Sequence, residues 1–111
     1  MHERLVPLIL RAERELRECA DSGEHPAAAL KAIIDCTGES LGLRMYGRAD
    51  PEWYARLSGI RGGIERAVST YGFDPELSAT ILRDELRRLE PLLKLARAHR
   101  DAERALEEAF A

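Results

Sequence analysis

Apolar residues recur every three or four positions along most of the chain, which is the spacing of one face of an α-helix. The longest such stretch lies in the last third, between Asp74 and Phe110. It opens with Asp74, Pro75 and Glu76, which supply a side-chain cap, a proline suited to the first helical position and a negative charge near the positive end of the helix dipole. The pattern therefore predicts a long C-terminal helical segment.

Pro91 falls inside this segment, and the apolar positions change phase after it. A proline inside a helix removes one backbone hydrogen bond and clashes with the preceding turn, so we expect a kink or a break near Leu89 to Glu90. Unbroken, the segment would be roughly 55 Å long. Its far end would then either fold back or pack on another chain. The stripe after the proline consists of Leu92, Leu95, His99, Ala102, Leu106 and either Ala109 or Phe110.

A first helix is predicted over residues 2–20, where apolar residues alternate with charged ones. Pro7 is tolerated in a first turn, so the regular helix is expected to begin at about Val6. Gly23 suits a left-handed C-terminal cap. The first two helices would then form a hairpin with a short loop.

The centre of the chain predicts an irregular connection between helices. The second helix begins near Pro26 and is expected to stop near Gly38 or Gly42, which leaves residues 42–50 as a loop. An Asp-Pro-Glu sequence at residues 50–52 repeats the capping arrangement of the C-terminal segment and starts a third helix.

Small residues interrupt this third helix: Ser58, Gly59, Gly62 and Gly63. Each interior glycine costs about 1 kcal/mol of helix stability relative to alanine, so the run needs a reason. We interpret it as a site where another helix backbone approaches closely. A local break at Gly62 and Gly63, or the close approach of a ligand, are the alternatives.

The 111 residues are expected to form a single domain, residues 1–111, with one modest core. Its predicted fold class is all-α, a bundle of four to five helices made of antiparallel hairpins and a long, Pro-kinked C-terminal segment. No apolar run is long enough for an export signal, which predicts a cytoplasmic protein without a membrane contact. Cys19 and Cys36 are expected to be buried free thiols, because helical geometry keeps them apart.

The candidate chemical groups argue against an enzyme. His99 lies on the apolar stripe with Glu103 one turn later, but the Glu-x-x-His pattern of carboxylate-bridged metal bundles is absent. We predict no catalytic residue, no metal site and no cofactor. We interpret His99 as a packed or interfacial histidine.

The central segment, residues 40–71, holds five basic and three acidic residues in a chain whose net charge is −3. It also contains all four Tyr and Trp residues of the chain, Tyr46, Trp53, Tyr54 and Tyr71, and Arg and aromatic side chains are frequent anchors of protein interfaces. The residues expected to bind a partner here are Arg44, Tyr46, Arg48, Trp53 and Arg56.

The sequence thus predicts a non-enzymatic protein–protein interaction module, such as a small regulator, adaptor or immunity-type protein, that self-associates as a homodimer or binds a protein partner. The expected contact helix carries Leu92, Leu95, His99, Leu106 and Phe110. The first alternative is a nucleic-acid-binding regulator that uses the central arginines and aromatic residues, although the small positive excess does not favour it. The second is a bundle that senses a small ligand or metal.

Overall fold

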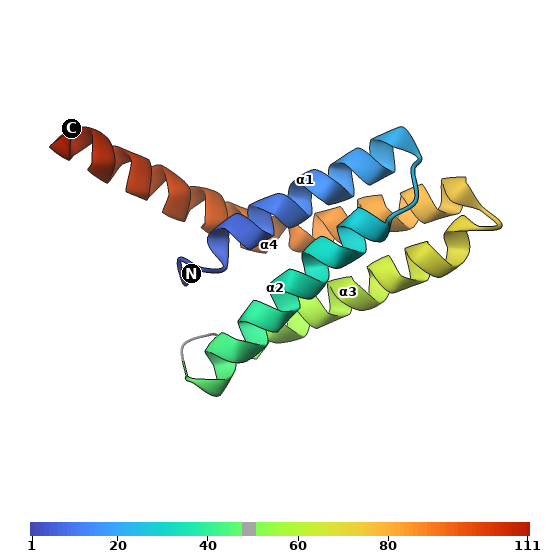
Figure 1. The fold of residues 1–111 in the computed structure, drawn as a ribbon, viewed down its shortest axis with the longest axis horizontal. Coiled ribbons are helices and arrows are strands. Elements are labelled where there is room, and N and C mark those ends of the chain that lie inside the picture. The colour runs from blue at the N-terminus through green and yellow to red at the C-terminus, as the bar shows by residue number, and fades with distance from the viewer. Residues whose placement is uncertain (48–50) are drawn as a thin grey trace.

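The computed structural model describes residues 1–47 and 51–111, and this part of the chain is an all-α bundle of four helices (Figure 1). The helices are α1 (Val6–Ser22), α2 (Ala27–Met45), α3 (Pro51–Tyr71) and α4 (Pro75–Phe110). The predicted fold class is therefore confirmed, with four as the number of helices in the described residues.

Two of the predicted helix ends are confirmed in detail. Helix α1 begins at Val6 with Pro7 in its first turn, and Gly23 ends it with a positive φ of 71°. The Gly23 N–H donates to the Cys19 carbonyl oxygen, as a left-handed cap requires. At the start of α4, Asp74 Oδ1 accepts a hydrogen bond of 3.0 Å from the backbone N–H of Leu77.

The predicted end of α2 is wrong. The helix continues through Gly38 and Gly42 to Met45, so residues 42–45 of the expected irregular segment are helical. A glycine weakens a helix by only about 1 kcal/mol, and packing of the buried face of α2 outweighs that cost. The cap predicted at Asp50 lies outside the described residues.

The interruptions expected in the two later helices do not take the form of breaks. Helix α3 is continuous through Gly62 and Gly63, and α4 is continuous through Pro91. The helical segment that contains Pro91 is thus a single element of 36 residues.

Each helix packs against two neighbours. Helix α1 contacts α2 and α4, and α3 contacts the same two helices, so the described chain forms a closed ring of four antiparallel contacts. The core draws leucine, isoleucine, valine, alanine and cysteine side chains from all four helices. The largest buried apolar side chains are Leu5, Ile9, Leu16, Ile33, Leu57, Ile60, Ile64, Leu82, Leu89, Leu92 and Leu93.

The end of α4 extends beyond this ring. Figure 1 shows the last turns of the helix projecting past the N-terminal end of α1. Residues 101–111 are all exposed, and the molecule measures 52 × 32 × 18 Å along its principal axes. Of the two arrangements expected for the far end of this segment, folding back is therefore excluded. Among the helices that the structure describes, none is both long and apolar enough to cross a membrane.

Candidate functional site

The projecting end of α4 presents a continuous uncharged surface, which we call the tail face. At 100° per residue its members cover an arc of about 140° on one side of the helix. The large side chains on it are open to solvent: Leu95 is 43% exposed, Leu106 61% and Phe110 84%. The tail face consists of Leu95, Ala98, His99, Ala102, Ala105, Leu106, Ala109 and Phe110.

Leu92 does not belong to the tail face, although the sequence pattern grouped it with Leu95 and His99. Its side chain is buried in the core, beside Leu93 and Ala96 in the sequence. The core-facing side of α4 and the tail face differ by roughly a quarter to a third of a turn about the helix axis. The tail face therefore adjoins the core-facing side of α4, and the two meet at the angular position that Leu92 and Phe110 share.

His99 sits at the edge of the tail face and is only partly exposed. Its Nε2 atom lies 3.1 Å from Glu103 Oε1, one turn further along α4. This pairing fixes the position of the ring, and it supplies one carboxylate neighbour. Within residues 1–47 and 51–111, no group of three or more His, Cys, Asp and Glu side chains lies where it could hold a metal ion.

The arginines and aromatic residues expected to bind a partner near the α2–α3 connection do not share one role. Tyr46 is 81% exposed at the end of α2, and the Arg44 guanidinium lies 5.3 Å from the centre of the Tyr54 ring. Trp53, by contrast, is partly buried and packs against the core. Arg56 donates a hydrogen bond of 3.4 Å to the backbone oxygen of Arg88.

Arg48 lies outside the described residues. Of the other residues in this group, Arg56 lines an open groove, and Arg44 and Tyr46 do not. A groove of about 440 Å³ between α3 and α4 is lined by Glu52, Ala55, Arg56, Gly59, Ile60 and Arg88. Its lining includes one acidic and two basic side chains, so it does not present a single sign of charge.

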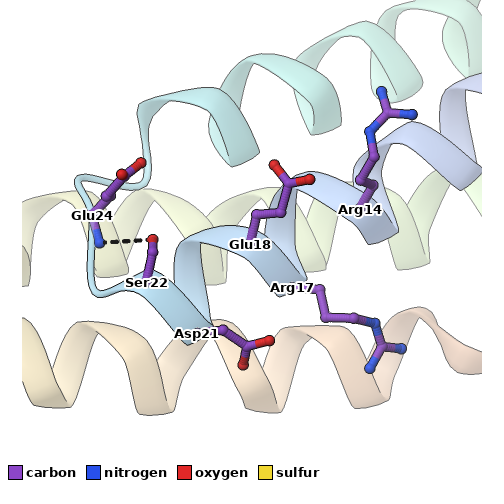
Figure 2. Close-up of a pocket in the computed structure, with 6 residues that line it drawn as sticks. All are labelled: Arg14, Arg17, Glu18, Asp21, Ser22 and Glu24. Carbon is purple, nitrogen blue, oxygen red and sulfur yellow. Dashed lines mark hydrogen bonds between the residues drawn. The ribbon is translucent and has the colours of Figure 1, made fainter.

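The hollow drawn in Figure 2 is larger, about 630 Å³, but it lies on the outer surface at the end of α1. Its six lining residues come from α1 and the loop that follows it. Figure 2 shows their charged ends spread along the helix surface rather than directed to one point. The only hydrogen bond drawn there joins the Glu24 N–H to Ser22 Oγ, at 3.2 Å. The hollow therefore lacks the converging polar groups of a ligand site.

The two thiols are buried and free, as predicted. Burial, reinforced by the nearby charge of Asp35, raises the pKa of the Cys36 thiol to about 12. Burial also raises the pKa of Cys19. Because the thiolate is the nucleophilic form, neither group is activated for covalent chemistry.

Sequence reasoning missed a buried carboxylate between α3 and α4. Glu85 is 1% exposed, and its Oε1 accepts a hydrogen bond of 2.8 Å from Arg88 Nη1 and lies 3.8 Å from Arg66 Nη2. Its Oε2 atom is buried and has no hydrogen-bond partner among the described residues. Burial raises the pKa of Glu85, while the two arginines partly offset that effect.

Gly63 on α3 makes room for this carboxylate. A Cβ atom at Gly63 would lie closer than 3.0 Å to three side-chain atoms of Glu85, whereas a Cβ at Gly59 or Gly62 would meet nothing within 4 Å. The predicted close approach of a helix backbone at these glycines is therefore wrong: the close neighbour, found at Gly63, is a side chain. The sequence signal was a charged residue at a core position between Leu82 and Leu89.

The outer side of α2 is a second exposed apolar surface that the sequence pattern did not reveal. Ile34, Gly38, Leu41 and Met45 recur at steps of four, three and four, and all four are exposed. The pattern was hidden because the buried side of α2 is equally apolar, so the helix shows no clear polar face.

Comparison with known proteins gave no match: no protein-family model, no curated protein and no solved structure is similar to this chain.

Proposed function

We propose that the protein is a non-enzymatic protein–protein interaction module, and that the tail face of α4 is its contact surface. The observation that carries the proposal is the projection of residues 101–111 beyond the bundle with Leu106 and Phe110 open to solvent. Contiguous exposed apolar side chains on an otherwise polar helix are a frequent mark of protein-binding surfaces.

The lack of packing at the end of α4 supports this interpretation. Residues 101–110 are the last helical residues of α4, and most helical stability in proteins comes from packing an apolar face. Residues 101–111 contribute no buried side chain to the bundle. A partner that covers the tail face would supply the missing packing. The contact would stabilise the same residues that it binds.

The reactive groups in the described part of the chain give little support to the alternative of an enzymatic function. Cys19 and Cys36 are buried with raised pKa values, and His99 pairs with one carboxylate. Glu85 is held between helices, away from solvent. None of these groups is both accessible and assembled with a second catalytic partner.

The test compares two matched double variants of the full chain. Leu106→Ser with Phe110→Ser removes the large apolar groups from the tail face, whereas Arg104→Ser with Glu108→Ser changes the charged side of the same turns. Tagged proteins are used to capture partners from an extract of the source organism, and light scattering after gel filtration measures their own mass. We expect the first variant to lose a protein contact that the wild type and the second variant keep.

Circular dichroism of each variant checks that the bundle is folded. The proposal fails if the wild type is monomeric and captures no protein whose retention depends on Leu106 and Phe110. Nucleic acid in the eluate in place of protein, seen in its ultraviolet absorbance ratio, would instead favour a nucleic-acid-binding regulator that uses Arg44 and Tyr46.

A further inference from the structure

We propose that the tail face binds a second copy of this chain, with the two α4 helices packed antiparallel about a two-fold axis at the bond between residues 100 and 101. This inference rests on the proposed function, since it names the partner of the same surface. Two features of α4 support it. A pair of exposed leucines is centred on one point of the helix, and the charge of the helix changes sign at the same point.

Two pairs of tail-face residues are related by symmetry about the bond between residues 100 and 101. Leu95 and Leu106 are the large aliphatic residues of the tail face, and the midpoint between them falls at that bond. In an antiparallel pair centred there, each Leu95 lies opposite the partner's Leu106. His99 then lies opposite the partner's Ala102, so a larger side chain meets a small one.

The charge pattern changes sign at the same bond. Residues 94–100 contain three basic and no acidic residues, and one of the three, Arg97, already pairs with Glu13 and Glu90 of its own chain. Residues 101–111 contain four acidic residues and one basic residue. Antiparallel pairing places the acidic half of each helix beside the basic half of its partner. Parallel pairing would place like charges together, which destabilises a complex.

The size and direction of the tail face also fit a second copy. From Leu95 to Phe110 it is about 23 Å long, at 1.5 Å per residue. Its alanines permit a close helix–helix approach, and its orientation away from the core side of α4 leaves room for another helix. A contact of this length lies at the low end of specific interfaces. The dimer should therefore dissociate on dilution.

Cysteine cross-linking tests the arrangement in the full chain. In the proposed pair the two copies of residue 102 are separated by about 4.5 Å along the helix axis, and those of residue 109 by about 25 Å. A disulfide needs Cα atoms within about 7 Å. We expect Ala102→Cys to form a covalent dimer under mild oxidation and the matched variant Ala109→Cys to remain uncross-linked.

The parent chain is the background control, because its own thiols are buried. Sedimentation of the wild type should show a dimer that dissociates on dilution. Its dissociation constant should rise by on the order of tenfold from low to molar salt as the charge attraction is screened. Cross-linking of both variants would show a parallel pair and overturn the inference. A dimer in which neither variant cross-links would place the interface elsewhere, for example on α2, and would overturn it as well.

The remaining outcomes separate this inference from the proposed function. A wild type that stays monomeric at every concentration, yet captures another protein through Leu106 and Phe110, would refute self-pairing and leave the interaction module intact. A monomer that captures nothing would refute both.

Discussion

A methyl group added at Gly63 would occupy space that the Glu85 carboxylate already fills. Three side-chain atoms of Glu85 lie closer than 3.0 Å to the position of the added Cβ, which is closer than real contacts of this kind. The carboxylate is 1% exposed and held by Arg88 on its own helix. Gly63→Ala must therefore displace Glu85 or separate α3 from α4.

The size of the effect follows from three contributions. Alanine favours the helix over glycine by about 1 kcal/mol. Overpacking costs about 1–3 kcal/mol. Displacing the carboxylate also loses its hydrogen bond to Arg88, and because that side chain is 57% exposed we take a low value of about 1 kcal/mol. We expect Gly63→Ala to lower the free energy of unfolding by about 2 kcal/mol.

Urea unfolding followed by far-ultraviolet circular dichroism measures this change. Gly59→Ala is the matched control, because its Cβ meets no atom within 4 Å, and it should raise stability by about 0.5–1 kcal/mol. In a Glu85→Ala background the clash disappears, so Gly63→Ala should become neutral or stabilising. If Gly63→Ala is as stable as Gly59→Ala in the wild-type background, Glu85 does not pack against Gly63 and the reasoning is refuted.

Three further predictions concern single groups. Because the pKa of Glu85 is raised in the folded state, the folded chain binds this proton more tightly than the unfolded chain does. The free energy of unfolding of the wild type, measured relative to Glu85→Gln, should therefore fall as the pH rises from 4.5. A rise over that range would contradict the assignment. Asp74→Ala should lower the free energy of unfolding by about 1 kcal/mol, whereas Asp74→Ser should retain most of the stability that the cap supplies. Equal losses for the two variants in urea titrations would show that the side-chain cap contributes nothing. Cys36 should resist iodoacetamide in the native chain and react once urea unfolds it, with mass spectrometry as the readout; rapid native labelling would show that the thiol is accessible.

Local signals predicted much of this fold. Gly23 and Asp74 mark their helix ends in the structure because each acts through its own backbone or through a neighbour three or four residues away. The same local reasoning misplaced the end of α2 at Gly38 or Gly42. There the favourable packing of the whole helix decided the outcome, and that packing depends on elements far away in the sequence.

The contact between Gly63 and Glu85 was beyond sequence reasoning for the same cause. A glycine in α3 and a glutamate in α4 become neighbours only when the register between the two helices is fixed. The apolar pattern of α4 predicted most of the tail face, but it did not predict which of the leucines are buried instead. Leu92 and Leu95 look alike in sequence, and only the side of α4 that the bundle covers, which still buries Ala96 beyond them, separates the buried residue from the exposed one.

Removing residues 101–111 tests whether the end of α4 serves self-association alone and contributes nothing to the stability of the bundle. Every side chain in this stretch is exposed, and the hydrogen bond that it makes with His99 is at the surface. Surface changes of this kind usually alter stability by no more than about 0.5 kcal/mol. The truncated chain should therefore keep the urea midpoint of the wild type under conditions where the wild type is monomeric. It should lose self-association completely, because Leu106 and the acidic half of the pair are gone. A large drop in the midpoint would mean that the tail stabilises its own bundle, and the exposed face would then need no partner to explain it.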